Sequence, residues 1–197
     1  MVTAGWAGTD WAEAQWLNPP ARTWTAGSDL LVEAREGSDF WRVTSYGFVH
    51  DDGHALLRPF PDGSAVEVAF TLDFDQQFDQ ARVLVRSDDE HWVKAGVEVS
   101  DGVSQLGAVV THARSDWSVA PVPAWSGRDV TVRASRTGDA LTVRARADDG
   151  SWQLVRVAPL PPGEVLAGPF CCGPTRAGLV VRFRSAVLTP ADASLHP

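Results

Sequence analysis

The chain has 197 residues and a formal charge of −8, with 44% hydrophobic and 21% charged residues, which is the composition of a soluble globular protein. A negative charge disfavours a nucleic-acid partner, because phosphate binding needs a basic face. No transmembrane span or signal peptide is recognisable, so no membrane partner is predicted and a cytoplasmic location is the expectation.

Three regions are predicted in chain order. Residues 1–15 lack strand periodicity and are expected to form an N-terminal arm that packs onto the domain. Residues 16–189 are expected to form a single β-sandwich domain, because no linker or internal repeat interrupts them. Residues 190–197 are expected to be a loose C-terminal tail.

Short strands separated by turn signals every 8–12 residues dominate the chain. The predicted strands are 30–36, 40–50, 54–60, 64–74, 80–87, 91–100, 103–114, 129–136, 140–148, 151–160, 165–172 and 177–189. Residues 115–127 are predicted to be a loop, and no segment is a convincing helix. This pattern predicts an all-β fold, an antiparallel β-sandwich of two sheets.

Alternation along residues 80–111 sorts the side chains of three neighbouring strands onto two faces. One face is apolar and is predicted to be core: it carries Ala81, Val83, Val85, Val93, Ala95, Val97, Val99, Leu106, Ala108 and Val110. The opposite face is polar: it carries Gln80, Arg82, Trp92, Lys94, Glu98, Gln105 and Thr111. Counting from the turns predicts that Glu98 lies opposite both Gln80 and Gln105.

The polar face has two interpretations. Antiparallel sheets commonly leave one face in solvent, which needs no function. Two features favour a binding site instead. Gly96 and Gly107 lie in adjacent strands, and a glycine in a strand often marks the close approach of a ligand or another chain. Lys94 is the only lysine among 17 lysine and arginine residues, and we expect it to serve a ligand or Glu98 as a compact charge.

Nine tryptophans accompany a single tyrosine, Tyr46. Core packing is the more common role of any one tryptophan, but a surplus on an all-β chain also suits sugar binding, where a flat ring stacks on a pyranose. Tyr46 suits a specific hydrogen bond from its phenol, or a buried position with a satisfied hydroxyl.

Several stretches together resemble a known family: "WLNPP", "DFWRVTSYGFVHDDGH", "QFDQARVLVRSDDEHWVKAGVE", "SDGVSQLGAVVTHARSDWS", "DGSWQLVR" and "GPFCCGPTRAGLVVRF". They are similar to the concanavalin A-like family of domain of unknown function 1349, whose members are often labelled regulation of enolase protein 1 or YesU-like. The resemblance runs from about Trp16 to Leu188. It implies a jelly-roll sandwich of the lectin/glucanase type and no established activity.

The family-like positions are carried over residue by residue: Gln80, Trp92, Lys94, Glu98, Thr111, Asp116 and Trp117, with Phe40, Trp41, Arg42, Tyr46, Asp52 and His54 from the first motif. Arg82 departs from the family pattern, which has a small residue after "DQA". This departure predicts a bulky cation in the groove.

Non-catalytic binding of a carbohydrate or small polar metabolite on the concave polar face is the favoured function. The predicted ligand-binding residues are Gln80, Arg82, Trp92, Lys94, Glu98, Gln105, Thr111, Asp116, Trp117, Trp41, Tyr46 and His54. One alternative is a glycoside hydrolase with Glu98 as acid/base, although no convincing second carboxyl lies beside it. The other is a protein-interaction module that regulates a metabolic enzyme.

No cofactor and no metal ligand are predicted. Cys171 and Cys172 are neighbours, which rarely bond to each other, and four ligands with zinc spacing are missing. The stretch "HDDGH" at residues 50–54 is interpreted as a hairpin turn, with a Ca²⁺ ion at this Asp-rich turn as an alternative.

Overall fold

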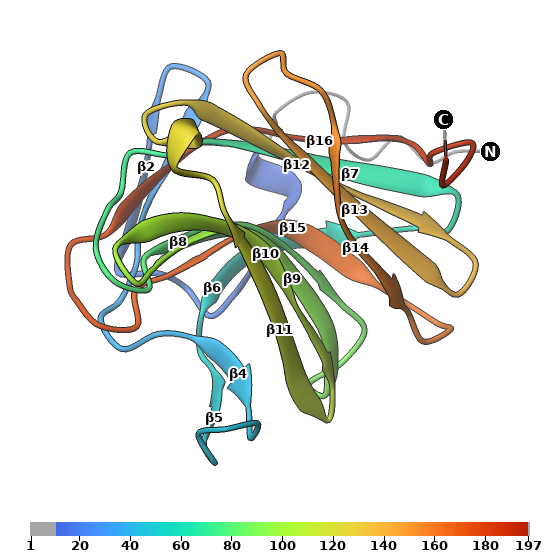
Figure 1. The fold of residues 1–197 in the computed structure, drawn as a ribbon, viewed down its shortest axis with the longest axis horizontal. Coiled ribbons are helices and arrows are strands. Elements are labelled where there is room, and N and C mark those ends of the chain that lie inside the picture. Colours follow the sequence, from blue (N-terminus) through green and yellow to red (C-terminus); the bar gives the residue numbers. More distant parts are fainter. Residues whose placement is uncertain (1–10, 197) are drawn as a thin grey trace.

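Two seven-stranded antiparallel sheets face each other in the computed structural model, which describes residues 11–196 (Figure 1). The first ten residues of the predicted N-terminal arm therefore lie outside the described residues. We call one sheet the site sheet, with strands in the order β1 (Gln15–Leu17), β6 (His54–Pro59), β15 (Leu166–Cys172), β8 (Gln80–Arg86), β9 (His91–Ser100), β10 (Val103–His112) and β11 (Arg114–Pro121).

The other sheet, here called the back sheet, covers the opposite side of the core. Its strands are β14 (Gln153–Pro159), β13 (Ala140–Ala147), β12 (Asp129–Thr137), β7 (Ser64–Thr71), β16 (Val180–Pro190), β3 (Asp29–Glu33) and β2 (Arg22–Ala26). The remaining elements are the pair β4 (Phe40–Arg42) and β5 (Val49–Asp51) and the 3₁₀ helices η1 (Trp11–Glu13) and η2 (Pro123–Trp125). None of the helices in the described part of the chain is long and apolar enough to cross a membrane.

The main core lies between the two sheets, where the alternating apolar residues of both sheets meet. Val83, Val97 and Ala108 of the site sheet are fully buried there, as are Val68 and Val132 of the back sheet. The sequence prediction for this face is confirmed, because all ten residues assigned to it belong to the main core.

Strand register also agrees with the prediction. Glu98 lies opposite Gln80 on β8 and opposite Gln105 on β10, and Lys94 lies opposite Leu84 and Val109. Alternation and two tight turns are sufficient to fix this register, because a slip of one residue would turn the buried valines outward.

The predicted strand 40–50 is wrong. Its two ends, β4 and β5, pair with each other as a short hairpin instead of continuing into β6. The chain reverses between them because Val43, Ser45 and Gly47 adopt positive φ angles of 64°, 65° and 75°. Backbone hydrogen bonds from Val43 N to Phe48 O and from Gly47 N to Val43 O, each 2.7 Å, close the reversal.

The predicted loop 115–127 is also wrong, because most of it forms β11 and η2. Its serines and prolines argue against a central strand, but β11 is the edge of the site sheet and pairs only with β10. An edge strand tolerates such residues, since one side of its backbone needs no partner. The short strands β1 and β2 were not predicted either.

Gly96 and Gly107 mark a close approach, but the approaching atoms belong to the same sheet. A Cβ atom at Gly96 would lie 2.6 Å from Ala81 O, and one at Gly107 would lie 2.1 Å from Ser118 O. Neighbouring strands therefore exclude any side chain at these positions. The expectation of a ligand against the glycines is corrected accordingly.

Several contacts anchor the C-terminal tail. Ala191 N donates to Gly63 O at 3.0 Å, and Leu195 O accepts from the Arg144 guanidinium at 2.7 Å. Asp192 forms ion pairs with Arg133, at 2.8 Å, and with Arg144. Both arginines lie on neighbouring strands of the back sheet, so this part of the predicted loose tail is held against it.

Candidate functional site

The β4–β5 hairpin covers the outer face of the site sheet, on the side away from the back sheet (Figure 1). Its Phe40 ring packs edge-on against Trp92 at 5.3 Å and against Phe170 at 5.5 Å. These rings belong to a second apolar cluster, here called the hairpin cluster: Phe40, Trp41, Ala55, Leu57, Leu84, Trp92, Val109, Phe170 and Cys172. The predicted polar face is therefore largely buried under the hairpin.

Polar contacts fix both strands of the hairpin. Arg42 of β4 forms a 2.6 Å ion pair with Glu90, and its backbone N–H donates to Ser115 Oγ at 2.9 Å. The Asn18 amide donates to the carbonyl oxygen of Asp51 in β5 at 2.6 Å. The hairpin is thus held at a defined distance above the sheet.

A cavity of about 460 Å³ remains between the hairpin and the site sheet. This volume is in the range of small-molecule binding sites. The cavity is lined by Gly37, Asp39, Trp41, Tyr46, Phe48, His50, Phe78, Gln80, Lys94, Glu98, Val109, Trp117, Pro174 and Thr175. Aromatic rings form much of its wall, and its charged groups are Asp39, Lys94 and Glu98, with His50 beside them.

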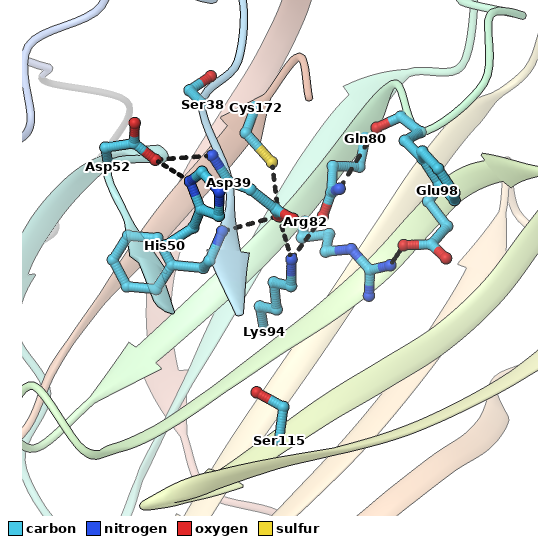
Figure 2. A network of polar contacts seen from close by, with 12 residues as sticks. Ser38, Asp39, His50, Asp52, Gln80, Arg82, Lys94, Glu98, Ser115 and Cys172 are labelled. Carbon is cyan, nitrogen blue, oxygen red and sulfur yellow. Dashed lines mark hydrogen bonds and ion pairs between the residues drawn. The ribbon is translucent and has the colours of Figure 1, made fainter. Parts of the chain in front are cut away.

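Lys94 occupies the centre of the polar network (Figure 2). Its ammonium donates to Asp39 Oδ1 at 2.9 Å and to Gln80 Oε1 at 3.0 Å, and the side chain is 2% exposed. The Phe170 ring lies 5.7 Å from Nζ, within reach of a cation–π contact. The protein partner of Lys94 is therefore Asp39, and the expected role as a counter-charge to Glu98 is corrected.

Asp39 is held as a carboxylate by its neighbours. Burial raises its pKa, but the charge and hydrogen bond of Lys94 and the N–H of Phe40, at 2.7 Å, outweigh that effect and leave the pKa below the ordinary value. The Cys172 thiol also donates to Asp39 Oδ1 at 3.6 Å, and burial raises the pKa of this thiol well above its ordinary value. These directions favour the carboxylate form of Asp39 and the thiol form of Cys172.

The stability contributed by Asp39 should depend on pH. Because its folded-state pKa lies below the ordinary 3.8, this stability is complete above the unfolded pKa and is lost as pH falls through the folded pKa. We expect Asp39→Asn to unfold in less urea than the wild type at pH 7, and the difference to narrow below pH about 4. Urea unfolding between pH 3 and pH 7 measures this.

The exposed Asp149 is a control, and Asp149→Asn should follow the wild-type curve at every pH. A difference between Asp39→Asn and the wild type that stayed constant down to pH 3 would contradict the ionised state assigned to Asp39.

Glu98 forms its ion pair with Arg82, whose side chain is 0% exposed. The Arg82 guanidinium also donates to Gly107 O at 3.4 Å. A Cβ atom at Gly96 would lie only 3.1 Å from the Cγ atom of Arg82. The two glycines thus leave room for the arginine to lie flat across the strands. The bulky cation expected in the groove instead lies beneath Glu98, outside the cavity lining.

Half of the predicted ligand-binding residues line the cavity: Gln80, Lys94, Glu98, Trp41, Tyr46 and Trp117. The other six predicted residues lie outside the cavity lining, for different structural reasons. Trp92 is 2% exposed inside the hairpin cluster, so its assignment to ligand contact is corrected. Thr111 is fully buried, and its hydroxyl bonds to Ser115 Oγ at 2.9 Å. Gln105 is not part of the lining.

Asp116 and His54 are also assigned to other roles. Alternation turns Asp116 away from its neighbour Trp117, and it forms a 3.1 Å ion pair with Arg156. His54 is 1% exposed and is hydrogen-bonded to Arg35 N at 3.0 Å and to Asn18 O at 2.9 Å. Burial lowers the pKa of His54, which fits a neutral structural imidazole.

Sequence reasoning missed eight lining residues. Val109 lies on β10, and the other seven come from loops or the hairpin: Gly37, Asp39, Phe48, His50, Phe78, Pro174 and Thr175. Tyr46 and Phe48 stack at 5.3 Å with an interplanar angle of 12°, and Trp41 meets Tyr46 edge-on at 5.6 Å. The signal was present in "WRVTSYGFVH", where aromatic residues flank a Ser-Tyr-Gly reversal, but it was interpreted as a continuous strand.

The "HDDGH" turn does not gather metal ligands. Asp52 Oδ1 accepts the backbone N–H of Asp39 at 2.9 Å and lies 3.6 Å from His50 Nδ1. Within residues 11–196, no three His, Cys, Asp or Glu side chains are grouped so that they could hold a metal ion. This geometry offers no support for the Ca²⁺ alternative.

The fold is a two-sheet antiparallel jelly-roll sandwich of the concanavalin A-like lectin/glucanase type, with a ligand-sized cavity on one sheet. The chain belongs to the family described as "Protein of unknown function (DUF1349)", whose model matches residues 16–191. The resemblance seen in the sequence motifs is thereby confirmed.

A yeast protein is among the similar sequences: "Regulation of enolase protein 1" of Saccharomyces cerevisiae is 38% identical over 190 residues, which cover 95% of this chain and 96% of the relative. A crystal structure of a functionally unknown protein from Saccharomyces cerevisiae superposes with a TM-score of 0.87 at 36% identity, over 94% of this chain and 100% of that one.

More distant solved structures include glycoside hydrolases. Xylan β-1,4-xylosidase from Bacillus halodurans C-125 matches with a TM-score of 0.63 at 13% identity, over 82% of this chain and 33% of the enzyme. At this identity the likeness concerns the fold alone.

Proposed function

We propose that the protein binds a carbohydrate or a small polar metabolite in the cavity between the hairpin and the site sheet, without transforming it. The observation that carries this proposal is the composition of the cavity. Trp41, Tyr46, Phe48 and Trp117 supply aromatic surface, while Lys94, Gln80 and Glu98 supply hydrogen-bonding groups beside it. Apolar walls with a few convergent polar groups are typical of small-molecule sites, and aromatic faces suit the apolar face of a sugar ring.

Trp117 offers a direct test, because it combines a position in the lining with 39% exposure on an edge strand. We expect Trp117→Ala to weaken saccharide binding at least about tenfold, which is about 1.4 kcal/mol. The stability should change by less than about 1 kcal/mol, since the ring is not core. Calorimetric titration with saccharides selected from a glycan array, together with urea unfolding, measures both quantities.

A matched control is Trp152→Ala. Trp152 is also partly exposed and lies under the Arg146 guanidinium at 4.5 Å, away from the cavity lining. It should leave saccharide affinity unchanged. Equal losses of affinity in both variants, or none in Trp117→Ala, would count against the cavity as the binding site.

Catalysis by Glu98 remains the enzymatic alternative, and the geometry favours it less. A glycosidase needs one carboxyl that carries a proton and a second carboxylate nearby. Both carboxyls of the cavity are already ion-paired within the protein, Asp39 with Lys94 at 2.9 Å and Glu98 with Arg82, so each is engaged by a cation of the chain itself. Turnover of aryl glycosides by the wild type that Glu98→Gln abolished would support the hydrolase and contradict non-catalytic binding.

A protein partner is the second candidate, and the exposed hairpin loop favours it. Tyr46 is 58%, Phe48 40% and Val49 48% exposed, which is unusual for apolar side chains that lie so close together. The name of the yeast relative points to an enolase as the partner to test. Co-sedimentation with purified enolase that Tyr46→Ser/Phe48→Ser abolished would support this function, and independent sedimentation would reject it.

A further inference from the structure

The charges of the cavity are already paired within the protein. Lys94 faces Asp39 at 2.9 Å, and Glu98 faces the Arg82 guanidinium that lies beneath it (Figure 2). Each of the charged lining residues Asp39, Lys94 and Glu98 thus has an opposite charge beside it among the described residues. A charged ligand would therefore meet a site whose fields largely cancel, and it would lose its own hydration without a new counter-ion. The formal charge of −8 additionally repels anions at long range.

Hydrogen-bonding positions, in contrast, remain open on both sides of this network. The Lys94 ammonium has three N–H donors and uses two of them, on Asp39 and Gln80. Glu98 accepts from Arg82 through Oε2, while its Oε1 has no hydrogen-bond partner among the described residues. Gln80 lies between these two groups, because it bonds to Lys94 and is the cross-strand neighbour of Glu98.

A free donor and a free acceptor in one cavity select the kind of ligand that can bind both. A carboxylate or phosphate offers acceptors only, so it would satisfy Lys94 and be repelled by Glu98. An ammonium offers donors only and would be repelled by Lys94. A hydroxyl donates and accepts at once, so a ligand with several hydroxyls can accept from Lys94 with one and donate to Glu98 with another.

The aromatic wall adds the requirement for an apolar face on the same molecule. Tyr46 and Phe48 are stacked at 5.3 Å, and Trp117 of the edge strand β11 belongs to the same lining. Rings of this kind pack well against the C–H face of a sugar. The geometry points to an uncharged saccharide as the ligand, bound through hydroxyls that contact Lys94 and Glu98. This inference rests on the proposed function and narrows its ligand class.

A matched set of ligands tests the charge requirement. A glycan array first selects the neutral oligosaccharide that binds most tightly, and calorimetry then compares it with its uronic-acid, phosphorylated and amino counterparts. We expect each charged counterpart to bind at least about tenfold more weakly than the neutral ligand. Tighter or equal binding of a charged counterpart would overturn the inference while leaving saccharide binding intact. Binding of no member of the set would overturn both proposals.

Variants that unbalance the charges should change this preference in a defined direction. Asp39→Asn and Glu98→Gln each leave one cation unpaired, so the affinity ratio should shift at least about tenfold toward the uronic acid. Lys94→Gln leaves Asp39 unpaired and should shift the ratio toward the amino sugar. If Glu98→Gln fails to fold, Asp39→Asn makes the same change of charge at a side chain that is 19% exposed.

Glu67→Gln is the matched control for these variants. Glu67 forms a 2.7 Å ion pair with Arg133 on the back sheet, so this change also breaks a partly buried pair but leaves the cavity untouched. Its ligand preference should equal that of the wild type. Cavity variants whose preference did not differ from that of Glu67→Gln would overturn the assignment of specificity to the two charge pairs.

Discussion

Replacing Lys94 by methionine is expected to lower the free energy of unfolding by about 3–5 kcal/mol, because breaking a buried ion pair leaves an uncompensated charge. Methionine keeps the unbranched apolar stem and removes only the ammonium. Asp39 would then lose its counter-charge, and Gln80 would lose a hydrogen-bond donor at 3.0 Å. Urea unfolding at pH 7 measures the loss.

The double variant Lys94→Met/Asp39→Asn distinguishes the stability lost with the ion pair from the stability lost through altered packing. Removing the charge on Asp39 as well should restore part of the stability, because an uncharged amide is easier to bury. Arg22→Met is a control: Arg22 is 68% exposed and pairs with Glu33, and such surface pairs contribute about 0–1 kcal/mol. A loss in Lys94→Met no larger than in Arg22→Met would contradict the network drawn around Lys94.

Phe40→Ala is expected to cost about 3–5 kcal/mol of stability, in the range of large-to-small changes at buried aromatic positions. The Phe40 ring is 2% exposed and contacts both Trp92 and Phe170 in the hairpin cluster. Because this ring is the main apolar anchor of β4, its loss should also move the hairpin wall and abolish saccharide binding. Unfolding curves and calorimetric titration measure the two effects.

Phe183→Ala is the matched control for that variant. Phe183 is 1% exposed and lies in the main core, where it contacts Phe70 at 6.4 Å. We expect a similar loss of stability with ligand affinity retained at temperatures where the variant is folded. If Phe40→Ala kept full affinity, the hairpin would not be a wall of the binding site.

Register and the inner core could be predicted from the sequence because both depend on local alternation. Residues 80–110 alternate so regularly that the turns before His91 and Val103 fix every cross-strand pair. Alternation assigns a residue to a face, but it does not reveal what covers that face. Trp92 was therefore assigned to the correct face and to the wrong environment, since Phe40 covers it from a distant segment.

The β4–β5 hairpin could not be recognised in the sequence, because its chain reversal contains residues that are unusual in turns. Val43 and Ser45 have positive φ angles, which valine in particular rarely adopts, so the sequence carries only Gly47 as a turn signal. The burial of Phe40 and the contacts of Arg42 hold these residues in place, and such tertiary effects are absent from a local pattern.

The ion-pair partners of Lys94 and Glu98 likewise could not be predicted from the local alternation of residues. Lys94 and Glu98 share a face, so they were expected to serve one another or one ligand. Lys94 instead meets Asp39, which lies 55 residues away in the sequence, and Arg82 reaches Glu98 from the adjacent strand. Room for Arg82 depends on Gly96 and Gly107, whose spacing was visible but was attributed to a ligand.

A crystal structure of the protein with the selected neutral saccharide would test the central claim most directly. We predict that the saccharide packs on Trp117 and Tyr46, with hydroxyls that contact Lys94 Nζ and Glu98 Oε1. A saccharide bound outside the cavity, for example against Trp152 beside the back sheet, would contradict the account.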